Sequence, residues 1–288
     1  MTVSGTRQRH TVRVGLAQIA TCPGQLSHNW QAHLWAIQEA KKADADLVVF
    51  PELSLSGYLV GHGVLELAMD LEDPRLDPVR EASREVALLV GLPLRLPQGG
   101  IANAAVLWEQ GQVVGVHHKL YLPTYGMFDE GRYFVPGQRL VPLPWGKGKL
   151  GVLICEDAWH PSCASLLVHR GTDLLLIMAG GPSEVGDDHV PLGMRRWHWL
   201  VGATAITTVT PTLFANRCGW EEGILFSGGS WALDGRGRTL AGPAPVGEPA
   251  LLVATVDLAA ARRHRSLAPI PQGERWELWQ AHGERSAC

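Results

Sequence analysis

Three ionisable side chains of this sequence are of types that together suit nucleophilic acyl transfer: a carboxylate, an amine and a thiol. Glu52, Lys119 and Cys155 each stand at or just after the end of a predicted strand. A thiol with a pKa of about 8.5 is mostly protonated at neutral pH, so it needs a base or a cation beside it. A carboxylate can take the proton, and an ammonium can favour the thiolate and later stabilise an oxyanion. Taken singly, each has an ordinary alternative: a solvated glutamate, a surface lysine, and a cysteine packed as a small hydrophobe.

The apolar runs that precede these residues predict strands. Residues 47–50 and 151–154 are continuously apolar, as expected of strands that are covered on both faces. Residues 104–108 and 113–117 flank a tight turn and predict a hairpin. Because the carboxyl ends of strands line the ligand crevice of layered α/β folds, three separate strands can deliver the three side chains to one place.

Helical spacing of apolar residues alternates with further strand patterns along the rest of the chain. This alternation predicts an α/β fold with mixed sheets, in one domain made of two sheets with helices outside. The predicted helices are 29–43, 78–87, 162–170 and 197–205, and the further strands are 12–17, 88–92, 174–178, 209–216, 229–233 and 251–256.

The two ends of the chain are expected to differ from its body. Residues 1–11 lack the apolar stretch of a secretory signal and are interpreted as a disordered lead-in. Residues 12–288 are predicted to form a single domain, whose tail from about 258 onward is expected to be irregular. Trp276 and Trp279 in that tail suggest docking on the body of the protein or on a partner subunit.

Composition excludes several classes of protein. Hydrophobic residues make up 46% and charged residues 18% of the 288 residues, so a large core is possible and disorder is not expected. The formal net charge is −3 without a basic stripe, which argues against nucleic acid as a partner. No apolar run reaches the roughly 18 residues of a membrane-spanning helix. The five cysteines are odd in number and widely spaced, which argues against a disulfide framework and fits the cytoplasm.

Longer stretches around the three side chains resemble the nitrilase, or carbon–nitrogen hydrolase, superfamily. V-F-P-E-L-S-L-S-G-Y at 49–58 resembles the base motif of that family, H-K-L-Y-L-P at 118–123 its lysine motif, and G-V-L-I-C-E-D at 151–157 its nucleophile motif. The order glutamate, lysine, cysteine is also the order of the family. The resemblance runs from about Val12 to Val256, and its further stretches are 130–137, 215–217, 229–230 and 234–237.

Two stretches resemble one branch of this family more closely. Residues 121–129 and C-E-D-A-W at 155–159 are similar to the glutaminase domain of glutamine-dependent NAD synthetase. Glu130 follows Lys119 by eleven residues, which is farther than in many members of the family. The Cys-Trp-Glu word of many nitrilases is absent, which favours an amide over a nitrile as substrate.

The resemblance implies a four-layer αββα sandwich of two mixed sheets with outer helices, usually paired across subunits, so a homodimer or higher homo-oligomer is expected. It implies Glu52 as general base, Cys155 as nucleophile and Lys119 as oxyanion stabiliser, with Glu130 assisting near the site. The backbone N–H of Glu156 would complete the oxyanion site. No metal and no cofactor is required.

The resulting hypothesis is a cysteine-dependent hydrolase that cleaves the C–N bond of a small linear amide through a thioester, giving a carboxylic acid and ammonia. Alternatives are a nitrile or an N-carbamoyl substrate within the same superfamily, or a non-catalytic scaffold with the same fold. The twelve histidines show no convincing ligand spacing with carboxylates, so a metal site is not predicted. The candidate substrate-binding residues, which core packing would explain equally well, are Tyr58, Tyr125, Phe128 and Trp159.

Overall fold

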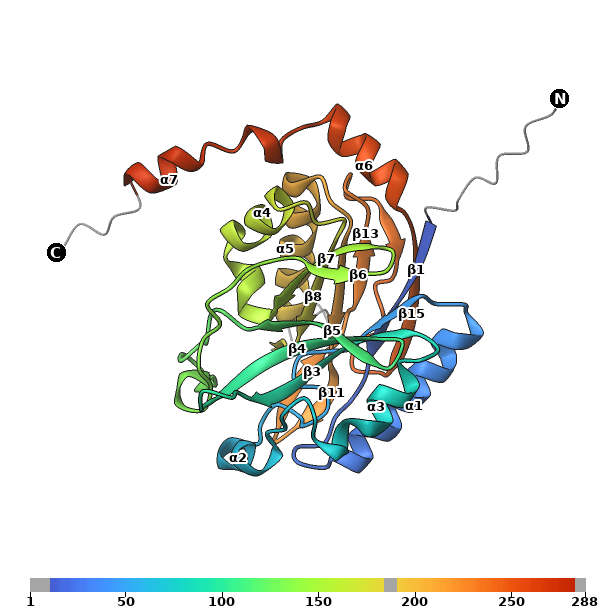
Figure 1. Cartoon of the computed structure of the whole chain (residues 1–288), viewed down its shortest axis with the longest axis vertical. Coiled ribbons are helices and arrows are strands. Elements are labelled where there is room, and N and C mark those ends of the chain that lie inside the picture. The colour runs from blue at the N-terminus through green and yellow to red at the C-terminus, as the bar shows by residue number, and fades with distance from the viewer. Residues whose placement is uncertain (1–10, 184–190, 283–288) are drawn as a thin grey trace.

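Two six-stranded sheets form the centre of the molecule (Figure 1). The structure is a computed structural model that describes residues 11–183 and 191–282. In spatial order, the strands of the first sheet are β15 (Ala250–Asp257), β1 (Thr11–Gln18), β2 (Leu47–Val49), β3 (Ala87–Arg95), β4 (Ile101–Glu109) and β5 (Gln112–His118). Those of the second sheet are β14 (Thr239–Ala241), β13 (Trp231–Leu233), β10 (Thr212–Asn216), β8 (Leu174–Ala179), β7 (Gly148–Ile154) and β6 (Leu143–Trp145). A small third sheet contains β11 (Cys218–Glu221), β12 (Ile224–Ser227) and β9 (Pro182–Ser183).

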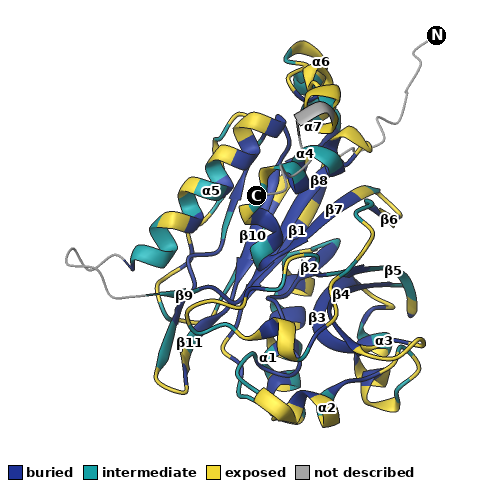
Figure 2. Cartoon of the chain, turned by 90° about the vertical axis from the view of Figure 1, so that its left-hand side faces the viewer, coloured by how far each residue is buried: buried dark blue, intermediate teal, exposed yellow. Residues whose placement is uncertain are grey.

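Helices cover the outer face of each large sheet, so the layers run helix, sheet, sheet, helix. Figure 2 shows buried strands in the interior and helices whose outward faces are exposed. No helix within 11–183 and 191–282 is long and apolar enough to cross a membrane. The first sheet carries α1 (Leu26–Lys42) and α3 (Asp77–Ala82), the second carries α4 (Pro161–His169) and α5 (Leu192–Thr208), and the remaining helices are α2 (Val64–Leu67), α6 (Leu258–Leu267) and α7 (Trp276–His282).

The short strand β2 shows how one apolar run serves two cores. Successive side chains of a strand point to opposite faces. Leu47 and Val49 pack into the core between the two sheets, whereas Val48 packs with Ile37 and Ala40 of α1. The parallel strands β1, β2 and β3 of one sheet and β7, β8 and β10 of the other are therefore apolar at most of their buried positions. This double coverage brings the ends of β2 and β7, and with them Glu52 and Cys155, into the interior.

The predicted αββα sandwich of two mixed sheets is confirmed by this architecture. Several boundaries differ from those predicted: the helix expected over 197–205 is Leu192–Thr208, and the strand expected over 209–216 is Thr212–Asn216. The helix expected to run to residue 87 ends at Ala82, because Ser83 caps it and Ala87 already pairs with Leu47 in the sheet. The lead-in expected to run to residue 11 ends earlier, since Thr11 begins β1; its other residues lie outside those the structure describes.

The tail beyond residue 258 was expected to be irregular, and this expectation is wrong. It forms α6 and α7, and the side chain of Asp257 caps α6 by accepting a hydrogen bond from the backbone N–H of Ala260 at 2.8 Å. Arg262 of α6 forms a salt bridge of 2.8 Å with Asp173, which ties the tail to the start of β8. Trp276 of α7 contacts His169 of α4 edge to face at 5.5 Å. Through Trp276 the tail therefore docks on the body, which was one of the two predicted alternatives, whereas the side chain of Trp279 lies outside what the structure describes.

Gly91 of β3 permits a close approach between that strand and the turn that carries Glu52. A β-carbon at this position would lie 2.5 Å from both the backbone nitrogen of Leu53 and the carbonyl oxygen of Pro51. We therefore expect Gly91→Ala to lower the free energy of unfolding by about 1–3 kcal/mol, because backbone must move to accept the methyl group. Urea denaturation measures this loss.

Gly202 of α5 supplies a matched control for Gly91→Ala. A β-carbon there would meet no heavy atom within 4 Å. Gly202→Ala should therefore leave stability unchanged or raise it by about 0.5–1 kcal/mol, since alanine is the better helix former. If Gly91→Ala unfolds at the wild-type urea concentration, the close approach described here does not exist.

Candidate active site

Glu52 and Lys119 are in direct contact inside the protein. Glu52 lies in the turn after β2, and Lys119 directly follows β5. Lys119 Nζ donates hydrogen bonds to Glu52 Oε1 at 2.6 Å and to Glu130 Oε1 at 2.6 Å, and all three side chains are buried. The ammonium therefore has one of its three N–H donors left for a further acceptor.

Cys155 lies at the end of β7, where the chain turns sharply into a 3₁₀ helix (Cys155–Trp159). Its φ angle is +45°, in the left-handed region that residues other than glycine rarely adopt. Such strain costs on the order of 1–3 kcal/mol and tends to occur at functional sites. The turn places the thiol within hydrogen-bonding reach of the Glu52 carboxylate. The three side chains that the sequence singled out therefore converge.

The charges of this cluster determine the protonation of the thiol. Burial raises the pKa of Cys155, the negative charge of Glu52 raises it further, and Lys119 opposes both. Burial alone would lower the pKa of Lys119, but the surrounding acidic groups, Glu52 first among them, raise it above its ordinary value. The resting site thus contains a neutral thiol, an ammonium, and a carboxylate positioned to accept the thiol proton.

Glu130 is a second carboxylate on Lys119 and lies at the start of a 3₁₀ helix (Glu130–Arg132). It accepts a hydrogen bond of 2.5 Å from the hydroxyl of Tyr58 as well as that from Lys119. Burial raises the pKa of Glu130 to about 7, against the opposing influence of Lys119. Glu130 is therefore placed to orient the ammonium together with Glu52.

A cavity of about 340 Å³ opens over Cys155 and gives the thiol a route to small molecules. Tyr125, Phe128 and Trp159, three of the four predicted substrate-binding residues, line it together with Trp197. A larger cavity of about 590 Å³ shares Tyr125, Phe128 and Arg196 with it. The hydroxyl of Tyr125 donates to the carboxylate of Glu156 at 2.8 Å, so a charged group also faces the opening.

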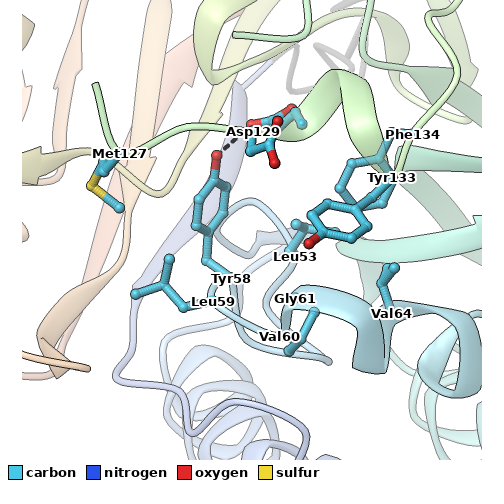
Figure 3. A pocket seen from close by; sticks show the side chains of 11 residues that line it. Leu53, Tyr58, Leu59, Val60, Gly61, Val64, Met127, Asp129, Tyr133 and Phe134 are labelled. Atoms are coloured by element: carbon cyan, nitrogen blue, oxygen red, sulfur yellow. Dashed lines mark hydrogen bonds between the residues drawn. The ribbon is translucent and has the colours of Figure 1, made fainter. Parts of the chain in front are cut away.

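Tyr58, the fourth predicted substrate-binding residue, is not among the residues that line the cavity over Cys155. It lines a separate, mostly apolar cavity of about 240 Å³ together with Leu53, Val64 and Tyr133 (Figure 3). In Figure 3 the ring of Tyr58 stands at the edge of this space, and a dashed line marks the hydrogen bond that its hydroxyl donates to Glu130. The structure thus places Tyr58 as a support of Glu130.

Two further groups hold the Glu52 carboxylate, and the sequence analysis did not identify them. Asn103 Nδ2 donates to Glu52 Oε1 at 2.8 Å, and the backbone N–H of Gly180 donates to Glu52 Oε2 at 3.0 Å. The signal for Asn103 was its polarity within β4, where the other residues from Ile101 to Trp108 are apolar. Gly180 left no comparable signal, because its backbone makes the contact.

The sequence is similar to a known family and to curated proteins along most of its length. Residues 13–266 match the family model described as carbon–nitrogen hydrolase. Glutamine-dependent NAD(+) synthetase of Thermotoga maritima is 32% identical over 235 residues, which cover 80% of this chain and 39% of that protein. The enzyme of the same name from Rhodobacter capsulatus is 34% identical over 252 residues, covering 86% of this chain and 44% of that protein. The chain thus spans about half or less of the length of these relatives.

Solved structures of the same family match this chain over nearly their whole length. A carbon–nitrogen hydrolase from Helicobacter pylori G27 superposes with a TM-score of 0.85 at 25% identity, covering 96% of this chain and 99% of that one. An amidase of the nitrilase superfamily from Nesterenkonia sp. AN1 superposes with a TM-score of 0.79 at 28% identity, covering 96% and 98%. With a family model matched over most of its length and this fold, the chain belongs to the carbon–nitrogen hydrolase family.

Proposed function

We propose that this protein hydrolyses the C–N bond of a small linear amide through a thioester on Cys155. One observation carries the proposal: Glu52 and Lys119 are in contact, and the Cys155 thiol lies within reach of Glu52 beneath a cavity. The relative from Nesterenkonia supports it, since one variant of that amidase carries the acetamide moiety of fluoroacetamide covalently at its active-site cysteine.

Acylation begins with transfer of the thiol proton to Glu52. A neutral thiol is a poor nucleophile, so the base must take the proton as the sulfur attacks the amide carbon. The oxyanion that forms accepts the remaining N–H of Lys119 and the backbone N–H of Glu156. Glu52 then returns the proton to the amide nitrogen, the C–N bond breaks, and ammonia leaves a thioester behind.

Deacylation uses the same groups in reverse. Glu52 takes a proton from a water molecule, and the resulting hydroxide attacks the thioester carbon. The oxyanion again lies between Lys119 and the Glu156 backbone. The C–S bond breaks, the thiolate recovers the proton held by Glu52, and a carboxylic acid is released. Lys119 stays charged, because the acidic groups around it raise its pKa, so it acts through its field and hydrogen bond.

Glutamine is the amide that we propose to test first. The glutamine-dependent synthetases named above match this chain along most of its length. The cavity over Cys155 is lined by the guanidinium of Arg196 and the carboxylate of Glu156, charges that suit the carboxylate and the ammonium of an amino acid. Arg196 lines this cavity, and it forms no salt bridge with any residue within 11–183 and 191–282.

Ammonia release over a panel of compounds tests the proposed function. The panel contains glutamine, other ω-amides, N-carbamoyl amino acids and nitriles, which separates an amidase from the alternatives within the family. Ammonia from amides supports the proposal. Release from nitriles or carbamoyl compounds alone would replace it with one of those activities. No product from any compound, together with no alkylation of Cys155 by iodoacetamide, would favour a scaffold.

Arg196→Gln separates amide hydrolysis from recognition of the substrate carboxylate. We expect KM for glutamine to rise by roughly 10- to 100-fold, because a charge-assisted hydrogen bond is worth about 1.5–3 kcal/mol. Hydrolysis of propionamide, which carries no carboxylate, should be unaffected. Arg170→Gln, at the end of α4 and outside the lining of the cavity, is the matched control. Equal effects of Arg196→Gln on both substrates would refute recognition of a carboxylate by Arg196.

A further inference from the structure

Asp157 is a buried carboxylate that accepts four hydrogen bonds, from β5 and the segment that follows it and from β7. Its Oδ1 accepts the backbone N–H groups of Leu120 at 2.9 Å and Tyr121 at 3.1 Å. Its Oδ2 accepts the backbone N–H of Ile154 at 3.1 Å and lies 2.9 Å from Nε2 of His117. The side chain of Asp157 is fully buried, so these protein donors replace all the water that a carboxylate would otherwise bind.

The four donors flank the two groups that the mechanism must keep in register. His117, Leu120 and Tyr121 lie on either side of Lys119 in the chain. Ile154 is the residue immediately before Cys155. Lys119 follows β5 of the first sheet, and Cys155 follows β7 of the second, so Asp157 connects the two sheets at the reacting centre. The core between the sheets is mostly apolar, and apolar contacts have no preferred direction. The hydrogen bond from the backbone N–H of Gly180 to Glu52 is a further directed contact between the sheets.

We propose that Asp157, together with His117, is a positioning residue that fixes the Lys119 ammonium relative to the Cys155 sulfur. The proposal rests on the acyl-transfer function proposed above. It goes beyond that function because neither side chain lines the cavity over Cys155. Directed hydrogen bonds to one rigid carboxylate oppose the relative sliding of β5 and β7 that apolar packing alone would permit. A misplacement of about 1 Å at such a centre can cost on the order of 100-fold in rate.

The four hydrogen bonds to Asp157 require a carboxylate at this position. An ionised carboxylate is only an acceptor, and three of its four partners here are backbone N–H groups that cannot change their role. An asparagine offers one acceptor oxygen and an NH₂ donor, so it must leave at least one of these backbone groups without an acceptor. His117 supplies the fourth donor, and glutamine is the residue that can replace it with an amide N–H.

Three substitutions and one control test this proposal. Asp157→Asn and His117→Leu remove acceptor or donor, and His117→Gln restores the donor. Asp173→Asn is the matched control, since Asp173 accepts the backbone N–H of Lys149 at 2.9 Å near the other end of β7. Two quantities are measured for each: kcat per alkylatable Cys155, and the pH midpoint of iodoacetamide alkylation of the Cys155 peptide. The titratable groups around the thiol are Glu52, Lys119, Glu130, Tyr58 and Tyr125.

We expect kcat to fall about 100-fold in Asp157→Asn and His117→Leu with little change in KM. The alkylation midpoint should move to higher pH, because Lys119 lowers the pKa of Cys155 and would lie farther from it. His117→Gln should restore both quantities, and Asp173→Asn should change neither. A purely structural role would reduce the yield of folded protein without moving the midpoint.

Unchanged midpoints and unchanged kcat per active thiol in Asp157→Asn and His117→Leu would overturn the proposal. His117→Leu keeps the three backbone contacts of Asp157, so it remains informative if Asp157→Asn fails to fold. The alkylation measurement needs no amide substrate. It therefore still tests the positioning role of Asp157 and His117 if the wild-type protein hydrolyses no compound of the panel and the proposed function fails.

Discussion

Cys155→Ala is expected to fold normally and to hydrolyse its amide at least about 10⁵-fold more slowly than the wild-type protein. Removal of the nucleophile from such a site typically abolishes all but the residual catalysis of the remaining groups. Little stability should be lost, because Cys155 contributes only a small buried side chain that is already held in a strained conformation. Ammonia release and thermal unfolding measured on the same preparation test both parts.

Cys218→Ala is the control for Cys155→Ala. Cys218 is also a buried free thiol, but it lies at the start of β11 and lines none of the cavities described above. It should keep the wild-type rate while losing a comparable amount of stability. Wild-type turnover by Cys155→Ala would show that the sulfur does not react, whatever its position.

Glu52→Gln is expected to lower kcat by roughly 10³- to 10⁴-fold, the loss typical of a missing general base. Glutamine retains an oxygen for Lys119 and Asn103 but cannot accept the thiol proton. The same change removes a negative charge that raises the pKa of Cys155. The thiol of Glu52→Gln should therefore ionise at lower pH, and iodoacetamide should alkylate it faster near neutral pH although turnover is slower.

This pair of opposite changes separates general base catalysis from simple activation of the thiol. If Glu52 acted only by favouring the thiolate, its loss would slow alkylation and turnover together. Asp173→Asn again serves as the control for neutralising a buried carboxylate of an ion pair, and it should change neither rate. Slower alkylation of Glu52→Gln would contradict the electrostatic account of the site.

The sequence predicted the layered fold and the position of Glu52 and Cys155 for one physical reason. Strands covered on both faces must be apolar throughout, so the runs before Glu52 and Cys155 were recognisable, and strand ends are where ligand sites form. The pattern alone predicted two sheets with helices outside. The resemblance to the carbon–nitrogen hydrolases added the order of the αββα layers. The contact of Lys119 with Glu52 follows from that arrangement.

Contacts made across the fold were not predictable in the same way. Asn103, Gly180 and Asp157 act through single hydrogen bonds to residues distant in the chain, and no periodicity records such partners. The pattern also failed where a tail packs on the body. Residues 258–267 carry several helix-forming residues after an aspartate cap, but their charged residues leave no clear apolar face in the sequence. The helix is held to the body by the salt bridge between Arg262 and Asp173, which the sequence does not reveal.

The four aromatic residues show the same limit at the site. Their types suggested a pocket, but only the turn at residues 123–129 and the 3₁₀ helix after Cys155 place Tyr125, Phe128 and Trp159 around one cavity. Tyr58 instead points its hydroxyl at Glu130, because burial leaves that carboxylate in need of a second donor. Residue type predicted aromatic lining, and tertiary packing decided which rings provide it.

Intact-mass spectrometry of acid-quenched turnover mixtures tests the central claim, that the Cys155 sulfur forms a covalent bond to the acyl group. We predict an adduct equal in mass to the substrate less ammonia, located on the Cys155 peptide and absent from Cys155→Ala. Glu52→Gln should accumulate this adduct if its deacylation is slowed more than its acylation. Steady ammonia release with no adduct in either protein, or an adduct on another residue, would contradict the account.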